Sequence, residues 1–245
     1  MKILGIIPSR YASSRFPGKP LAVIDGKTMV QRVYEQAAKC KSINRLLVAT
    51  DHKAIFNNVT DFGGEAVLTE TNIASGTERC YQAWIKKGRE DDDFDVIINI
   101  QGDEPFINPE QIGKVAALFT RKSIEIGTLI KKITAENELN NPNVVKVVKN
   151  VSDEAIYFSR ATIPYIRGKE SPGSAVDFYK HIGLYGYRVE TLKKLVELPP
   201  SALEKAESLE QLRWLENGYK IHTAETDTDI IGIDTYDDLI KVTKT

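Results

Sequence analysis

The sequence Gly5-Ile-Ile-Pro-Ser-Arg-Tyr-Ala-Ser-Ser-Arg-Phe-Pro-Gly-Lys-Pro20 joins an apolar run to a loop of small and cationic residues. The apolar residues that begin at Ile3 predict a buried strand, which the first proline ends. Arg10, Arg15 and Lys19 follow on one loop, at the strand end where open α/β sheets bind their ligands. Clustered cations repel one another unless an anion lies among them. The stretch therefore predicts either a polyphosphate site or a solvated basic loop.

Two common phosphate-binding motifs do not describe this loop. Gly18-Lys19 is followed by Pro20, where a Walker A motif has Ser or Thr. No Gly-x-Gly-x-x-Gly fingerprint follows the first predicted strand either. Side-chain cations would therefore have to bind the anion.

Length and charge narrow the class of protein. The chain has 245 residues, which suits one large α/β domain or such a domain with a small elaboration. With 42% hydrophobic and 27% charged residues, it can bury a sizeable core and stay in solution. The 33 Lys and Arg residues nearly balance 34 Asp and Glu residues, for a net charge of −1. This balance argues against a general nucleic-acid binder or a binder of anionic membranes.

The sequence predicts a cytoplasmic protein with no membrane insertion. Its two cysteines, Cys40 and Cys80, lie in helical patterns and are too few for a disulfide framework or a zinc site. We expect no signal peptide before the first strand, and the sequence has no apolar run of about 18 residues.

Strands and helices alternate in the first half of the chain. Apolar runs predict strands over 44–50, 66–68 and 95–100, and helical spacing predicts helices over 28–39, 51–62 and 76–87. Asp51 is expected to cap the second of these helices, and Asn108-Pro109 to start a further one. This alternation predicts a Rossmann-like, mostly parallel sheet with helices on both faces.

The rhythm changes near residue 127. Strands are predicted over 128–133, 144–149, 155–158 and 178–187, with no long helix between them, which indicates antiparallel pairing. Ser208 is expected to open a capped helix that ends near Asn217, 230–233 to be strand-like, and Thr235 to cap a last helix. We therefore predict a single α/β domain over 1–245 with a smaller mixed subdomain at about 127–220.

Acidic residues follow two predicted strands. Asp103 lies in Gln101-Gly-Asp-Glu-Pro105, and Asp234 follows Ile230-Ile-Gly-Ile. Either motif alone can be a turn or a helix start. Together, at the edge that carries the basic loop, they suggest a Mg²⁺–triphosphate site, because Mg²⁺ commonly takes one or two carboxylates plus substrate phosphates. Ser75-Gly-Thr-Glu-Arg79 reads equally as a plain helix start or as a ligand-binding one.

Eight motifs occur in one order and together resemble the 3-deoxy-manno-octulosonate cytidylyltransferase (CMP-Kdo synthetase) family over residues 3 to about 240. They are Ile7-Pro-Ser-Arg-Tyr-Ala-Ser-Ser-Arg-Phe-Pro-Gly-Lys-Pro20, Ala49-Thr-Asp51, Ser75-Gly-Thr-Glu-Arg79, Gln101-Gly-Asp-Glu-Pro105, Tyr157-Phe-Ser-Arg-Ala-Thr-Ile-Pro164, His181-Ile-Gly-Leu-Tyr-Gly-Tyr187, Leu209-Glu-Gln-Leu-Arg213 and Gly232-Ile-Asp-Thr235. Departures from the pattern are Ser9, where Ala is common, and Tyr165-Ile166, where an aromatic–acidic pair often stands.

The resemblance implies transfer of CMP from CTP to the sugar acid Kdo, with Mg²⁺ and release of pyrophosphate, for lipopolysaccharide biosynthesis by a homodimer. It implies a catalytic role for Lys19, Asp103 and Asp234, the two aspartates as Mg²⁺ ligands. It also implies nucleotide binding by Ser9, Arg10, Arg15, Lys19, Ser75, Gly76 and Gln101. The residues implied for the sugar are Gln101, Arg160, Arg167, His181, Tyr187, Glu210 and Gln211.

Three other functions stay open on the sequence. The same motifs could serve an 8-amino analogue of Kdo. A related α/β glycosyltransferase is a second alternative, although an Asp-x-Asp signature at a strand end is missing here. A protein that binds CTP without turnover is the third.

Overall fold

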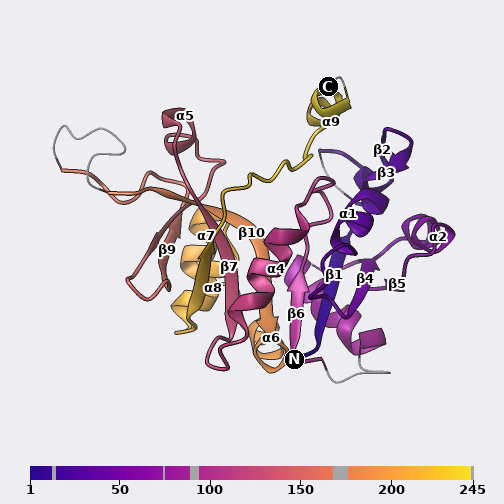
Figure 1. The fold of residues 1–245 in the computed structure, drawn as a ribbon, viewed down its shortest axis with the longest axis horizontal. Helices are drawn as coiled ribbons and strands as arrows, with labels where there is room; N and C mark the ends of the chain where they lie inside the picture. Colours follow the sequence, from indigo (N-terminus) through magenta and orange to yellow (C-terminus); the bar gives the residue numbers. More distant parts are fainter. Residues whose placement is uncertain (13–14, 74, 89–93, 168–175, 244–245) are drawn as a thin grey trace.

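The strands of the computed structural model form one large sheet (Figure 1), and the structure describes residues 1–245 except 13–14, 74, 89–93, 168–175 and 244–245. In the described chain the sheet has nine strands, in the order β11-β7-β10-β6-β1-β4-β5, with β8 pairing β10 and β9 pairing β8. Their bounds are β1 Ile3–Ser9, β4 Arg45–Thr50, β5 Ala66–Leu68, β6 Val96–Asn99, β7 Ile126–Lys132, β8 Lys146–Lys149, β9 Ala155–Ser159, β10 Tyr179–Arg188 and β11 Ile221–Glu225. A separate hairpin joins β2 (Val23–Ile24) to β3 (Lys27–Thr28).

The half of the sheet that carries the basic loop is parallel. Strand β1 pairs with β4 and with β6, and β4 pairs with β5, all in parallel. Ile3 and Ile7 of β1 face one apolar cluster, whereas Leu4 and Ile6 face the other. Both faces of the strand are therefore buried, which explains its continuous apolar run.

Strand β10 begins the antiparallel half. It pairs antiparallel with β6, β7 and β8, and β8 pairs antiparallel with β9. Strand β11 returns parallel to β7. The long β10 therefore joins the two halves into one continuous sheet.

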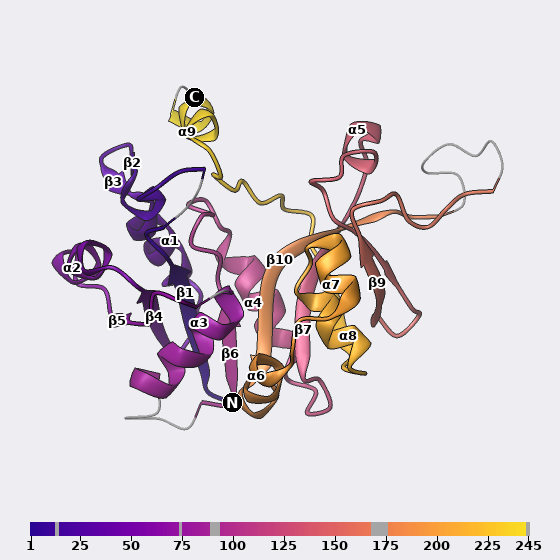
Figure 2. The same ribbon diagram turned by 180° about the vertical axis from the view of Figure 1, so that it is seen from behind.

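Helices cover both faces of the sheet (Figures 1 and 2). The apolar cluster on one face includes residues of α1, α2 and α4, and the cluster on the other includes residues of α3, α6 and α8. The helices are α1 Met29–Ala37, α2 Lys53–Asp61, α3 Gly76–Ala83, α4 Pro109–Leu118, α5 Glu136–Leu139, α6 Val189–Glu197, α7 Ala202–Glu207, α8 Gln211–Glu216 and α9 Tyr236–Thr243, with a 3-10 turn over Lys19–Leu21 and a π-helical turn over Trp84–Gly88.

The predicted fold class, a mostly parallel sheet flanked by helices with a smaller antiparallel part, is confirmed. Three local predictions are wrong. His52, not Asp51, caps α2, because its Nδ1 accepts a hydrogen bond from the Ala54 amide at 3.2 Å. The capping box belongs to Ser201 and Glu204 of α7, whereas Ser208 ends that helix with a φ of 52°. Residues 230–233 are not a strand, because the chain leaves the sheet after β11.

No helix in the described ranges is long and apolar enough to cross a lipid bilayer.

Candidate active site

A cavity of about 340 Å³ lies where β1 and β6 end. Its wall contains every residue that the sequence assigned to the nucleotide or the metal. The lining residues are Pro8, Ser9, Arg10, Arg15, Lys19, Pro20, Ile73, Ser75, Gly76, Arg79, Gln101, Gly102, Asp103 and Asp234.

Parallel pairing explains why two of these segments meet. In β1 and β6, Ile6 lies opposite Asn99, so both chains leave the sheet at the same edge. The two segments then pass so closely that a Cβ on Gly102 would lie 2.6 Å from the Pro8 carbonyl oxygen. A side chain at Gly102 would push the two walls apart, so the position requires glycine.

Lys19 is the centre of the charge arrangement. Its Nζ lies 2.8 Å from Asp103 Oδ2 and 3.2 Å from Asp234 Oδ1. Arg15 Nη2 lies 3.2 Å from the other oxygen of Asp234. The Ile233 amide donates to the Asp103 carbonyl at 2.9 Å, which holds the two acidic segments together. Two carboxylates thus converge on one cation from segments that lie far apart in sequence.

These carboxylates fit a magnesium ion that also binds a substrate phosphate. The described residues contain no group of three or more His, Cys, Asp or Glu side chains placed to hold a metal by themselves. Mg²⁺ does not require such a group, because it often keeps waters and takes one or two carboxylates together with phosphate oxygens. The convergence of Asp103 and Asp234 on the Lys19 ammonium shows that both can face a single cation.

A buried arginine supports the start of the basic loop. Arg79 is 2% exposed, and its guanidinium donates to Thr69 Oγ1 at 2.5 Å and lies 3.4 Å from Asp51 Oδ2. The other oxygen of Asp51 accepts the Tyr11 amide at 2.9 Å, so Asp51 ties α3 to the loop. Sequence reasoning did not assign a site role to Arg79, although it stands in the Ser75–Arg79 motif.

A second cavity of about 430 Å³ adjoins the first, and Gly76 and Gln101 line both. Its other lining residues are Thr77, Asn99, His181, Gly183, Tyr185, Ser208, Leu209, Glu210, Gln211 and Trp214. The side-chain Nε2 of Gln101 donates to the Gly183 carbonyl at 2.9 Å, which fixes this side chain between the two cavities.

His181 is neutral near pH 7. Burial lowers its pKa to about 3, and its Nε2 lies 3.1 Å from Thr128 Oγ1. A histidine that resists protonation is a weak general base but can still form hydrogen bonds with a ligand.

Several buried polar atoms in the wall of the second cavity have no hydrogen-bond partner among the described residues. They are Asn99 Oδ1, Tyr185 OH, Gln211 Nε2 and Trp214 Nε1. Buried polar groups are rarely left unpaired, so a set of both donors and acceptors indicates a ligand with several hydroxyl groups. The sequence pointed to Gln211 but not to the other three. Of these three residues, Tyr185 could have been found from the sequence, because it lies in the His181–Tyr187 motif.

Three of the predicted sugar residues lie outside this wall. Tyr187 is fully buried and stacks on Tyr185, with ring centroids 5.8 Å apart. Arg167 is exposed. The guanidinium of Arg160 is engaged elsewhere, because its Nε and Nη1 donate to the carbonyls of Glu207 at 2.7 Å and Pro142 at 3.0 Å. A direct contact of Arg160 with a ligand in this cavity therefore requires a different side-chain position.

Glu104 is a buried acid next to Asp103. It is 7% exposed, and its Oε2 has no hydrogen-bond partner in the part of the chain that the structure describes. Burial, and then the charge of Asp103, raise its pKa well above the usual range. The neutral, protonated form of Glu104 is therefore favoured.

Comparisons with known proteins agree on one family. A sequence model described as cytidylyltransferase matches residues 4–221. Proteins named 3-deoxy-manno-octulosonate cytidylyltransferase from Parabacteroides distasonis and Cytophaga hutchinsonii are 54% and 53% identical, over 98% and 100% of this chain and 96% and 98% of their own. A solved CMP:2-keto-3-deoxy-manno-octonic acid synthetase in complex with CTP is 39% identical, with a TM-score of 0.91. The match covers 100% of this chain and 98% of the solved one.

Proposed function

Because the chain belongs to the family of 3-deoxy-manno-octulosonate cytidylyltransferases, we propose that it transfers CMP from CTP to Kdo and releases pyrophosphate. The observation that supports this most directly is the pair of adjoining cavities, one charged and one polar, which share Gln101 and Gly76. A two-substrate transfer requires two such sites side by side.

The charged cavity suits the triphosphate of CTP. Arg10, Arg15 and Lys19 supply positive charge, and helix α3 begins at Gly76, which lines the cavity. Positive side chains and a helix N-terminus both favour phosphate. Lys19 is placed to offset the negative charge that builds up on the α-phosphate during transfer.

We assign the metal role to Asp103 and Asp234, with Mg²⁺ as the ion. When bound, Mg²⁺ would neutralise phosphate charge and favour ionisation of the attacking sugar hydroxyl. The hydrogen bond from the Ile233 amide to the Asp103 carbonyl holds the two acidic segments together, so contacts within the protein bring the aspartates close to each other.

The polar cavity suits the sugar. Gln101, His181, Glu210 and Gln211 surround it, and neutral His181 can bind a hydroxyl without competing for its proton. Arg160 and Arg167 remain candidates for the sugar carboxylate, since a guanidinium binds a carboxylate with two hydrogen bonds. We propose that the product then serves lipopolysaccharide assembly and that the enzyme acts in the cytoplasm.

Pyrophosphate release tests this function. The purified protein with Mg²⁺ should release pyrophosphate from CTP in the presence of Kdo. CTP with the 8-amino analogue is the comparison that identifies the preferred sugar. Absence of release with both would refute the proposed activity, and consumption of a CMP-sugar would favour a glycosyltransferase instead.

A further inference from the structure

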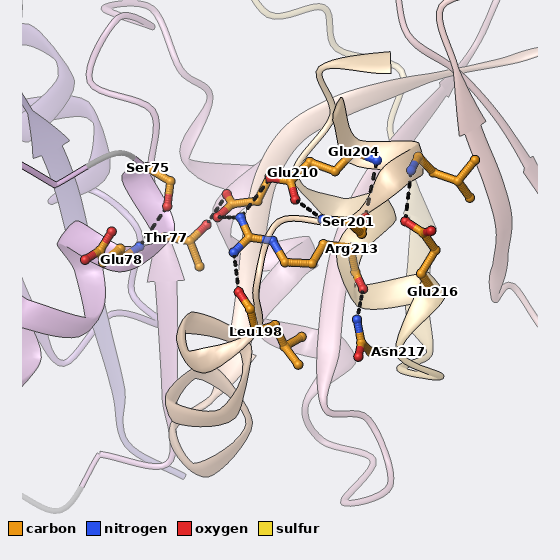
Figure 3. A network of polar contacts seen from close by, with 11 residues as sticks. Ser75, Thr77, Glu78, Leu198, Ser201, Glu204, Glu210, Arg213, Glu216 and Asn217 are labelled. Carbon is orange, nitrogen blue, oxygen red and sulfur yellow. Dashed lines mark hydrogen bonds and ion pairs between the residues drawn. The ribbon is translucent and has the colours of Figure 1, made fainter. Parts of the chain in front are cut away.

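A chain of polar contacts joins three helices beside the second cavity (Figure 3). Glu210, which directly precedes α8, accepts a hydrogen bond at Oε2 from Thr77 Oγ1 at 2.7 Å. Its Oε1 lies 3.4 Å from Arg213 Nη2. Thr77 belongs to the first turn of α3, whose first residue, Gly76, lines both cavities. Glu210 therefore connects the sugar side of the site to the nucleotide side.

The guanidinium of Arg213 is held from the opposite direction. Its Nη1 donates to the Leu198 carbonyl at 2.8 Å, and its Nη2 donates to Glu204 Oε1 at 2.8 Å. Glu204 is itself fixed, because its second oxygen accepts the Ser201 amide in the capping box of α7. The Arg213 side chain is 12% exposed, so few alternative positions are open to it. The third polar contact that the described residues make with the guanidinium is that of the Glu210 carboxylate.

We propose that Arg213 is a positioning residue that keeps the Glu210 carboxylate charged and directed into the second cavity, where it accepts hydrogen bonds from substrate hydroxyls. This inference rests on the proposed function, because it assigns the sugar to that cavity. Arg213 does not itself line the cavity, so its effect passes through Glu210.

Electrostatics supports the same arrangement. Burial raises the pKa of Glu210, and hydrogen bonds from Thr77 and Ser75, followed by the charge of Arg213, oppose that rise. Among the described residues, the positive side chain that lies within ion-pair distance of the Glu210 carboxylate is that of Arg213.

The other titratable groups that face Glu210 supply no positive charge. Glu204 of α7 raises its pKa further. Burial raises the pKa of the Cys80 thiol on α3 and of the Tyr185 and Tyr187 phenols on β10, so these groups stay neutral.

Steady-state kinetics of Arg213→Gln provide the first test. We expect the KM for Kdo to rise about 10-fold or more, the loss typical of one hydrogen bond to a charged group, with the KM for CTP changed less than about two-fold. The acidic limb of kcat/KM for Kdo should move to higher pH, because Glu210 without Arg213 takes up a proton more readily. Arg213→Lys, which keeps the charge, should move this limb less and is the second variant if Arg213→Gln folds poorly.

Asn217→Ala is the matched control, at the C-cap of the same helix. Asn217 Nδ2 donates to the Arg213 carbonyl at 2.8 Å and does not reach the guanidinium. The control should keep the wild-type pH profile and KM for Kdo. Equal effects of Asn217→Ala and Arg213→Gln would show a merely structural role and overturn the proposal.

A titration without turnover separates this inference from the proposed function. In protein labelled with ¹³C at the glutamate carboxyls, the Glu210 resonance is assigned by its loss in Glu210→Gln. Its midpoint should lie at higher pH in Arg213→Gln than in the wild type, and an unchanged midpoint would refute the role of Arg213. Wild-type protein that releases no pyrophosphate refutes the activity, whereas the titration still decides the role of Arg213.

Discussion

Lys19 carries the strongest functional argument at the scale of single residues. Its ammonium is shared by Asp103 and Asp234, so it lies at the point where phosphate, metal and protein charge would meet. A charge placed in advance lowers the barrier to transfer because no reorganisation is needed during the reaction.

Lys19→Ala should therefore lower kcat by about 10²-fold or more, the loss typical of removing one charge-stabilising donor. Pyrophosphate release at saturating CTP and Kdo measures it. Lys27→Ala is the control, because Lys27 is exposed on the β2–β3 hairpin and pairs with Glu35. Turnover of Lys19→Ala at the wild-type rate would remove Lys19 from the mechanism.

Asp103→Asn and Asp234→Asn should each weaken the binding of Mg²⁺ and so raise the Mg²⁺ concentration that turnover requires, since each removes one charged oxygen ligand. The measurement is the Mg²⁺ concentration for half-maximal rate, with Asp25→Asn in the β2–β3 turn as the control. A shift in one variant and not in the other would show that the two carboxylates do not share an ion.

At the scale of elements, the crossing segment 226–235 decides where Asp234 lies. The segment runs from β11 over the top of the sheet to α9 (Figure 1). Asp229 anchors it, with Oδ2 2.5 Å from Lys131 Nζ and Oδ1 2.7 Å from Lys180 Nζ. A second anchor is the hydrogen bond from Gln111 Nε2 to the Thr228 carbonyl at 3.0 Å. Beyond Thr226, whose amide donates to the Ile130 carbonyl of β7, the segment belongs to no strand of the described sheet, so such contacts hold Asp234 in place.

Asp229→Asn should raise the half-maximal Mg²⁺ concentration by about 2–5-fold, because partly exposed ion pairs contribute up to about 1 kcal/mol. Asp227→Asn is the matched control, an exposed aspartate on the same segment. An equal effect of both changes would attribute the shift to net charge and not to the anchoring of Asp234.

At the scale of the whole molecule, β9 presents an unpaired edge. In the described sheet β9 pairs with β8 alone. Apolar side chains are exposed on and near it, with Val151 fully exposed, Ile156 60% exposed and Tyr165 87% exposed. Exposed apolar patches of this kind mark protein interfaces, and open strand edges invite pairing. We propose that two copies of the chain meet here to form a homodimer.

Ile156→Asp should shift the protein toward monomer, because the new charge would be buried without a partner at the interface. Sedimentation velocity at several protein concentrations measures the change. Val23→Asp, at an exposed apolar position on the β2–β3 hairpin, should leave the assembly as it is. A monomeric wild type, or an Ile156→Asp variant that sediments as the wild type does, would contradict this interface.

Local chemistry alone determined the parallel half of the sheet and the charged residues of the first cavity. Buried strands require apolar runs, and ligand-binding residues follow the ends of such strands. Ser9, Arg10, Lys19 and Asp103 could therefore be found from their positions relative to two apolar runs. Family resemblance, carried by the eight motifs, supplied the expectation of CTP and Kdo.

Only the tertiary structure decided how distant residues combine. Asp51 is of a residue type that commonly caps helices, and it stands just before α2. Its carboxylate instead binds Arg79 and the Tyr11 amide, two partners that no local pattern reveals. The polar wall of Asn99, Tyr185 and Trp214 arises where β6, β10 and α8 meet, and their unpaired atoms can be recognised only once burial is known. Local sequence sets which groups are available, whereas packing decides which of them face a partner and which face a ligand.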